Sequence, residues 1–307
     1  MPVTQLIGFS VTVSDLAGAA AFYRDALGLQ IGPEQTFRNS AWNRLLGLAP
    51  DTTARAVDIA IGRQTVQLVA FDPLGRPYPP ERASNDQWFQ HFALVSGNIS
   101  KSWERLIISS SPSEITKGPP VLLPPNTGSV TAFKFRDPEG HPLELISFPP
   151  DIGAAVWQET SGEGILGCDH TALSIMDLDR SIAFYSGLLG FRVAGRSLNH
   201  GPEQDRLDGL VGCEVDVVAL EPAAVAIPHV ELLHYRKPPG RISTLSGQAN
   251  DVASVRQVHK VDNLGALVEG LHAGGTTFVS PGVVSLEESG KAAAIRDPDG
   301  HMILLME

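Results

Sequence analysis

The sequence contains the same pattern twice, and this repeat constrains the fold more than any other feature. Residues 11–29 read VTVSDLAGAAAFYRDALGL, and residues 173–191 read LSIMDLDRSIAFYSGLLGF about 160 positions later. A second shared motif closes each half, as RDPEGH at 136–141 and RDPDGH at 296–301. The chain is therefore a tandem duplication with small insertions, and we expect two halves of the same fold.

Each half divides again into two units that open with a strand and a helix. Such openings occur near residues 6–28, 89–108, 168–190 and 255–273. In the third opening Thr171, Leu173 and Ile175 alternate with His170, Ala172 and Ser174, as in a half-buried strand. The predicted helix N-caps share a short polar side chain: Asp15, Asn98, Asp177 and Asn263.

Short strands complete each unit. In each half the closing strands are joined by an Asp-Pro-Glu-Gly or Asp-Pro-Asp-Gly turn, in which glycine supplies a positive φ. Gly28 and Gly190 stand where a left-handed residue would end the helix. The sequence thus predicts the α+β class with four βαβββ modules, at about 5–72, 88–149, 165–236 and 253–307. Joints rich in proline and glycine separate them.

Composition restricts the partners. The chain has 23 Lys and Arg against 34 Asp and Glu, a net charge of −11, which argues against nucleic acid and anionic membranes. The two cysteines form no disulfide framework, and no secretory or transmembrane segment is visible, which favours the cytoplasm. We expect a small-molecule substrate, and a monomer or homodimer.

The module pattern and its two motifs resemble the vicinal-oxygen-chelate superfamily, which includes glyoxalase I, extradiol dioxygenases, methylmalonyl-CoA epimerase and bleomycin-resistance proteins. The resemblance covers nearly the whole chain and implies two cupped-sheet, glyoxalase-like domains, at 1–150 and 165–307. It also implies that two modules form a cupped sheet around one metal ion. Each module then offers one ligand position in its first strand and one in its last.

Transferred to this chain, these positions differ sharply between modules. The first-strand positions of modules one to four carry Gly8, His91, His170 and Arg256. Gln257 is a near alternative to Arg256. The last-strand positions carry Gln67, Glu144, Glu231 and Leu304. Module one paired with two, or three with four, would leave every site incomplete.

Crossed pairing gives a different result. Modules two and three would together provide two histidines and two carboxylates: His91, Glu144, His170 and Glu231. Modules one and four would keep a degenerate cup that cannot hold a divalent cation well: Gly8, Gln67, Arg256 and Leu304. Arg256 could instead be a surface residue, or could bind an anion in that cup.

The ligand set suits one divalent ion: Zn, Ni, Co, Mn or Fe(II). By resemblance, such a centre predicts a lyase or isomerase that moves a proton on a substrate with two adjacent oxygens. Glu144 is the expected base and Glu231 the second choice. Apolar residues on the same strand faces would line the pocket: Ile146, Phe148, Leu233 and Tyr235. The alternatives are an Fe(II) ring-cleaving dioxygenase and a small-molecule binding or resistance protein without chemistry.

Other conspicuous residues have structural explanations. His141 and His301 directly follow a hairpin glycine, which indicates a role in the turn. Tyr23 and Tyr185 fall on apolar helix faces and are expected in the core. His229, Glu231 and His234 are not a zinc-protease motif, because on a strand His234 takes the opposite face.

Overall fold

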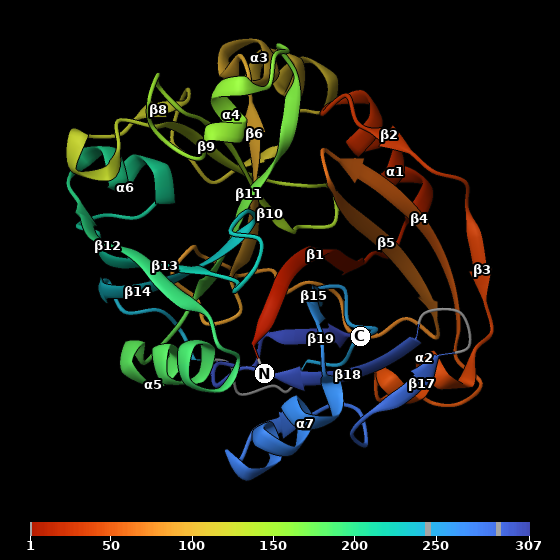
Figure 1. Ribbon diagram of the computed structural model, residues 1–307. Coiled ribbons are helices and arrows are strands. Elements are labelled where there is room, and N and C mark those ends of the chain that lie inside the picture. Colours follow the sequence, from red (N-terminus) through yellow and green to blue (C-terminus); the bar gives the residue numbers. More distant parts are fainter. Residues whose placement is uncertain (1, 243–246, 287–289) are drawn as a thin grey trace.

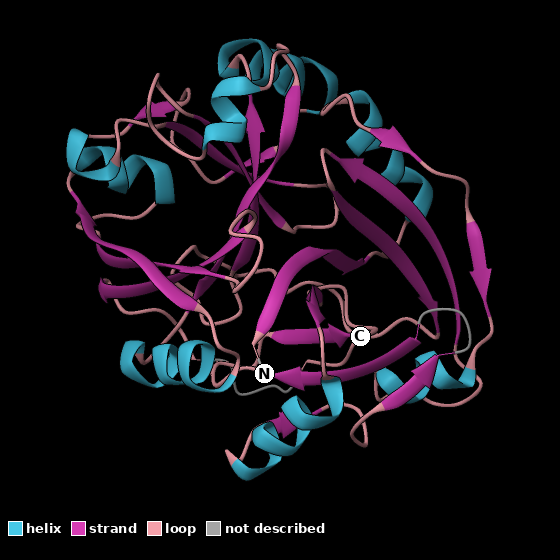
Figure 2. Ribbon diagram, viewed as in Figure 1, coloured by secondary structure: helices cyan, strands magenta, loops and turns pink. Residues whose placement is uncertain are grey.

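The computed structural model describes residues 2–242, 247–286 and 290–307. Its strands form two mixed sheets, and helices lie at the periphery of the molecule (Figure 1, Figure 2). The first sheet contains β1 (Val3–Thr12), β2 (Gln30–Ile31), β3 (Gln35–Phe37), β4 (Thr53–Ile61), β5 (Gln64–Asp72), β15 (Val255–Val261), β16 (Thr277–Phe278), β17 (Val284–Leu286), β18 (Gly290–Arg296) and β19 (Met302–Met306). The second contains β6 (Gln90–Ser96), β7 (Ser113–Glu114), β8 (Val121–Leu122), β9 (Thr131–Arg136), β10 (Pro142–Ser147), β11 (Ile165–Ser174), β12 (Arg192–His200), β13 (Glu214–Glu221) and β14 (His229–Lys237).

The described helices follow the module pattern, with short additions. They are α1 (Leu16–Asp25), α2 (Ser40–Leu45), α3 (Ile99–Ser110), α4 (Ala155–Glu159), α5 (Leu178–Ile182), α6 (Pro202–Asp208), α7 (Leu264–Ala273) and the 3₁₀ helix η1 (Pro125–Thr127). A π-helical segment, Ala183–Leu188, continues α5. None of the helices in the described residues is long and apolar enough to span a membrane.

Each sheet combines one module from each half of the sequence. The first sheet runs β16-β18-β19-β15-β1-β5-β4-β2, which joins module four to module one. The second runs β12-β13-β14-β11-β6-β10-β9-β7, which joins module three to module two. Antiparallel pairs, β1 with β15 and β6 with β11, connect the modules. The predicted crossed pairing is confirmed.

The two largest apolar clusters, in contrast, largely follow the halves of the sequence. Phe9 of the first sheet stacks on Phe92 of the second, with ring centroids 4.9 Å apart, in a cluster drawn mostly from the first half. A second cluster is drawn mostly from the second half and includes Tyr185 and Leu305. The strands of each half of the sequence are thus divided between the two sheets. The apolar side chains of that half still pack together, in a core that lies between the sheets. The domain boundaries at 1–150 and 165–307 stay a prediction.

The predicted helix starts are confirmed. In α1, α3, α5 and α7 the side chain of the predicted N-cap accepts a hydrogen bond from a backbone N–H in the first turn. Gly28 and Gly190 adopt φ values of 74° and 77°, so the left-handed ends are also confirmed. These caps fix where each first strand stops, and hence which residues of that strand can reach the cup.

The closing hairpins are held by their aspartates. Asp137 Oδ1 accepts hydrogen bonds from the backbone N–H groups of Glu139, Gly140 and His141. The Tyr23 hydroxyl donates to Asp137 Oδ2 at 3.3 Å, and the His141 ring lies 2.9 Å from the same oxygen. The expected structural role of His141 and the buried position of Tyr23 are confirmed.

Candidate metal centre

Two histidines and two glutamates meet on the four central strands of the second sheet. His91 lies on β6, His170 on β11, Glu144 on β10 and Glu231 on β14. The strand register places Glu144 and His170 on either side of Ala93. Residues that lie opposite one another across neighbouring strands share a face. These side chains therefore project from the same concave face, which we call the cup of the second sheet.

Glu144 lies between the two imidazole rings. Its Oε2 atom is 2.9 Å from His91 Nε2 and 3.4 Å from His170 Nε2. His170 Nε2 is also 3.6 Å from Glu231 Oε2. The structure therefore brings together all four residues that crossed pairing selected. Their role as metal ligands stays a prediction.

The centre is closed on one side and open on the other. His91, Glu144 and His170 are at most 5% exposed as whole residues. The Glu231 side chain is 22% exposed. Glu231 is therefore the member of the group that is most accessible to solvent.

Asp169 and His229 belong to the same cluster. Asp169 Oδ2 is 3.1 Å from His170 Nδ1 and 3.9 Å from His229 Nδ1. His229 Nε2 is 3.4 Å from Glu231 Oε1. The register of β11 against β6 shifts between Cys168 and His170, a bulge that can turn consecutive side chains the same way. Strict alternation would have placed Asp169 on the opposite face, so sequence reasoning missed it.

A buried cation lies beside the glutamates. Lys134 lies opposite Glu144 in the pairing of β9 with β10, and its Nζ donates to Asp208 Oδ1 at 2.7 Å. Asp208, at the end of α6, also accepts from the Tyr235 hydroxyl at 3.0 Å. The sequence contained one sign of Lys134: it is a charged residue between two phenylalanines in a predicted strand.

Neighbouring charges control the protonation of the cluster. Burial would raise the pKa of Glu144, but hydrogen bonds with His170 and His91 hold it well below its usual value. Burial likewise opposes the charge of Glu231, yet the His170 charge and the His229 hydrogen bond lower its pKa to about 2. Burial opposes the charge of His170, but Glu231 and Asp169 raise its pKa well above the usual value. The two glutamates are therefore ionised.

The cluster fits a divalent cation. Single ligand atoms of His91, Glu144 and His170 all lie within 4.8 Å of one another. The Nδ1 atom of His170 faces Asp169, which leaves Nε2 directed at both glutamates. Metal-binding histidines usually have a carboxylate or carbonyl on the second ring nitrogen, because it fixes the orientation of the ring. Two imidazoles and two carboxylates would together bind an ion of intermediate hardness.

The four predicted pocket residues lie near this centre but are mostly packed. Ile146 is buried in an apolar cluster, with Phe148 at its edge. Leu233 and Tyr235 are buried in a neighbouring cluster that includes Ala172. Whether they contact a substrate stays a prediction.

The first sheet repeats this geometry with other residues. Gly8 lies opposite Val258 in the first sheet, and His91 lies opposite Ala172 in the second. In the same way, Gln67 lies opposite Ser10 in the first sheet, and Glu144 lies opposite Ala93 in the second. The remaining two positions of that cup are held by Arg256 and Leu304. The register thus selects Arg256 rather than Gln257.

Gly8 and Arg256 cannot act as metal ligands, unlike the histidines at the equivalent positions of the second sheet. A Cβ atom on Gly8 would lie 2.2 Å from the backbone oxygen of Thr65, so β5 leaves no room for a side chain. Arg256 is completely buried, which rules out the surface alternative. Its guanidinium donates to hydroxyls and a carbonyl, including Ser10 Oγ and Ala249 O.

Comparison with known proteins agrees with this architecture. The sequence profile of the glyoxalase/bleomycin resistance protein/dioxygenase superfamily matches residues 5–145 and 167–305. A lactoylglutathione lyase of Arabidopsis thaliana is 27% identical over 217 residues, which cover 68% of this chain and 62% of that protein. The match thus spans less than two thirds of the relative.

The fold is also found in solved structures. Glyoxalase I from Zea mays superposes with a TM-score of 0.65 at 17% sequence identity, covering 99% of this chain and 92% of that chain. A mutant of the same maize enzyme gives the same TM-score at 18% identity. At this level of identity the likeness concerns the fold alone.

Proposed function

Since the chain belongs to the glyoxalase/bleomycin resistance protein/dioxygenase superfamily, we propose that it is a metal-dependent lyase or isomerase of the glyoxalase kind. The observation that supports this is the convergence of two imidazoles and two carboxylates in one buried cup. The expected substrate is a small molecule with two adjacent oxygen atoms. The relative named lactoylglutathione lyase makes the thiol adduct of an α-ketoaldehyde the first substrate to test.

His91, Glu144, His170 and Glu231 would hold the ion. When bound, a divalent ion supplies Lewis acidity that stabilises negative charge on substrate oxygens. The donor set suits Zn, Ni, Co, Mn or Fe(II).

The glutamates would move the proton. Glu144 is ionised and could accept the proton from the carbon that bears the hydroxyl oxygen, then give it to the adjacent carbonyl carbon, while the hydroxyl proton passes to the second oxygen. Its burial keeps bulk water away from the proton during the transfer. Glu231 is the alternative base, because its side chain is the more exposed of the two.

The chain would orient these groups through the surrounding polar contacts. Asp169 fixes the ring of His170, and His229 holds one oxygen of Glu231. Lys134 is directed at Asp208, which keeps a positive charge near both glutamates without a direct bond to either. Each reacting group is thus positioned by a neighbour on the same sheet or on α6.

A second candidate is an Fe(II) ring-cleaving dioxygenase. His91, Glu144 and His170 form a close group of two histidines and one carboxylate, the set used by non-haem iron oxygenases. Glu231 lies outside that group. Iron in the purified protein, together with oxygen consumption on a catechol, would favour this candidate over proton transfer.

The test is a substrate panel combined with two glutamine variants. The panel contains hemithioacetals of α-ketoaldehydes, 2-substituted acyl thioesters and catechols. Glu144→Gln keeps an oxygen donor but removes the base, so turnover should fall by about 10²–10⁴ while much of the metal stays bound. Glu231→Gln should reduce turnover less.

Two outcomes would change the assignment. The larger loss in Glu231→Gln would transfer the role of base to Glu231. Turnover on no panel member, together with no bound metal, would overturn the proposal in favour of a binding protein. Gln67→Ala is the matched control, because Gln67 holds the position of Glu144 in the first sheet.

A further inference from the structure

The cup of the first sheet contains a cavity that the proposed reaction does not use. Its volume is about 430 Å³, within the usual range of small-molecule sites. The sheet forms one side, and α2 contributes Trp42 and Asn43 to the other. Three of the four residues at the degenerate ligand positions line it: Gly8, Gln67 and Leu304.

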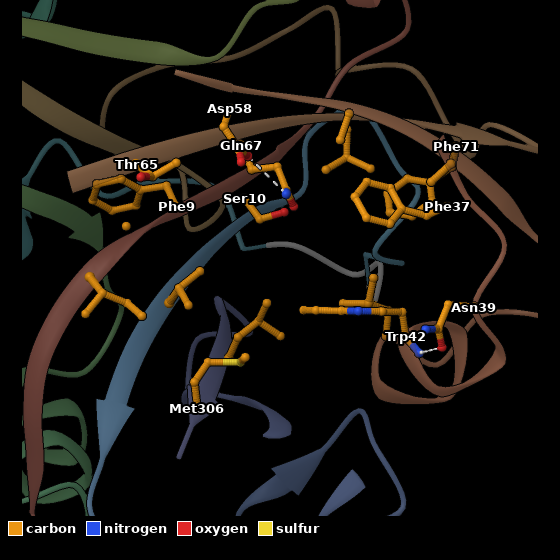
Figure 3. Close-up of a pocket in the computed structure, with 18 of the residues that line it drawn as sticks. Phe9, Ser10, Phe37, Asn39, Trp42, Asp58, Thr65, Gln67, Phe71 and Met306 are labelled. Atoms are coloured by element: carbon orange, nitrogen blue, oxygen red, sulfur yellow. Dashed lines mark hydrogen bonds between the residues drawn. The ribbon is translucent and has the colours of Figure 1, made fainter. Parts of the chain in front are cut away.

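The walls are mainly apolar, and three of the aromatic rings gather on one side (Figure 3). Figure 3 shows Phe37, Phe71 and Trp42 together, with Met306 farther along the cavity. Aromatic rings grouped beside a space favour a flat ligand, because stacked and edge contacts add to the apolar area that is buried. This side of the cavity therefore selects for shape rather than for charge.

A row of four polar residues crosses the floor of the cup. The register places Asp58 of β4 opposite Gln67 of β5, Gln67 opposite Ser10 of β1, and Ser10 opposite Arg256 of β15. An acidic group thus lies at one end of the row and a basic group at the other. The first three of these residues line the cavity, as Figure 3 shows.

Ser10 offers a hydrogen-bond donor. Its Oγ accepts from Arg256 Nη2 at 2.8 Å and from Nε at 3.2 Å. Within the described residues no acceptor is found for the Ser10 hydroxyl hydrogen, while the buried guanidinium makes that hydrogen more acidic. A ligand oxygen that accepts a hydrogen bond would be stabilised at this end.

Asp58 and Gln67 offer acceptors at the other end. Gln67 Nε2 donates to Asp58 Oδ1 at 3.1 Å, which leaves the second carboxylate oxygen and the Gln67 carbonyl free within the described part of the chain. The remaining polar side chains near α2 serve the helix itself. Asn39 caps it, and Asn43 donates to the carbonyls of Pro50 and Thr52.

We propose that this cavity is a metal-free binding site for an uncharged, planar aromatic molecule of two or three rings. The ligand carries a carbonyl oxygen that accepts from Ser10 and a hydroxyl that donates to Asp58 or Gln67. The opposite charges of Asp58 and Arg256 favour a neutral, polarised ligand over an ion. Gly8 and Leu304 provide no metal donor, so the site works by shape and hydrogen bonds alone.

The test uses 6-hydroxy-2-acetylnaphthalene as a probe, titrated calorimetrically into the full-length protein with its native metal content. We expect one saturable site per chain. Trp42→Leu should weaken binding at least tenfold through the loss of ring contacts. Ser10→Ala should weaken it about fivefold, the usual value of one hydrogen bond. Thermal melting checks that both variants fold, since Ser10 also contacts Arg256.

Two controls locate the probe. Trp103→Leu, in α3 and outside the cavity, should leave the Kd unchanged; its buried indole N–H has no partner among the described residues, so no hydrogen bond to them is lost. Glu144→Gln should also leave the Kd unchanged, because the probe would lie in the other cup. The proposal therefore stands or fails independently of the proposed reaction.

Three results would contradict this site or its ligand. No saturable binding, or an unchanged Kd in both Trp42→Leu and Ser10→Ala, would overturn the site. Loss of binding in Glu144→Gln would move the probe to the second sheet. The carboxylate 6-hydroxy-2-naphthoate should bind at least tenfold more weakly; equal or tighter binding would overturn the assignment of an uncharged ligand.

Discussion

Arg256 holds in the first sheet the position that His170 holds in the second. Each lies opposite a small residue of the neighbouring antiparallel strand, Ser10 for Arg256 and Ala93 for His170. The two cups therefore share one backbone arrangement but differ in chemistry. One gathers imidazoles and carboxylates, and the other contains a buried cation beside an apolar cavity.

The purified protein should bind one equivalent of a divalent metal per chain. His170→Ala and Glu144→Ala should each weaken binding by more than about 100-fold, since each removes a proposed ligand; loss of an outer partner alone typically costs 10–100-fold. Elemental analysis and competition with a chelator measure both quantities.

The matched control is Gln67→Ala, which alters the equivalent position of the first sheet and should leave metal affinity unchanged. Two tight equivalents per chain, or a loss of metal in the control, would contradict the assignment of the ion to the second sheet.

Asp169→Ala should weaken metal binding by about 10–100-fold, because Asp169 holds the Nδ1 side of His170. Asp216→Ala provides the comparison, since Asp216 lies 3.2 Å from His234 Nδ1 on the same sheet but outside the site. Metal affinity should change only in the first variant. Equal affinities in both would mean that Asp169 does not orient a ligand.

Gly8→Ala should lower the free energy of unfolding by about 1–3 kcal/mol, the usual cost of overpacking. The added Cβ would lie 2.2 Å from the Thr65 carbonyl oxygen, so the two strands must separate. Gly195→Ala is the control in strand β12, where a Cβ meets no atom within 4 Å. Urea unfolding compares the two, and equal stabilities would show that the strands adapt freely.

Stability should depend on pH through His141. Burial opposes its charge, but Asp137 and the Val252 carbonyl raise its pKa above the usual value. The imidazolium therefore stabilises the fold fully below pH about 6.5, and this contribution is lost as pH rises through the higher folded pKa. The stability difference between the natural protein and His141→Gln should be about 3 kcal/mol at pH 6 and shrink at higher pH.

His259 provides a control of opposite sign. Burial lowers its pKa to about 3, so the folded protein keeps this ring neutral while the unfolded chain protonates below pH about 6.5. His259→Leu should therefore remove a loss of stability that develops on acidification. A His141→Gln difference that is constant from pH about 5 to 9 would show that folding does not shift the pKa of His141.

Much of the architecture could be predicted because the sequence repeats. Helix starts at Asp15 and Asp177 depend on local capping, which one short segment specifies. The pairing of modules is a long-range property, yet the uneven distribution of His91, Glu144, His170 and Glu231 indicated it. A complete ligand set could form only if the second and third modules shared a sheet.

The parts that could not be predicted depend on local departures from regular structure. Asp169 reaches the site through a bulge in β11, and alternation contains no sign of that shift. The helices α2 and α6 each span less than two turns, too short for a clear apolar period. The cavity depends on where α2 packs over the sheet. The register of the strands does not predict that position.

The crossed sheets have a consequence for how the two cups can diverge. In a symmetric pair of identical half-length chains, any substitution would appear in both cups at once. Here Gly8 and His170 are separate positions of one covalent chain, although the repeat gives them equivalent places in the two halves and in the two sheets. One cup can therefore lose its donors and acquire a different specificity while the other keeps its own. For protein engineering, the same independence means that a new ligand site could be evolved in one cup without altering the side chains of the other.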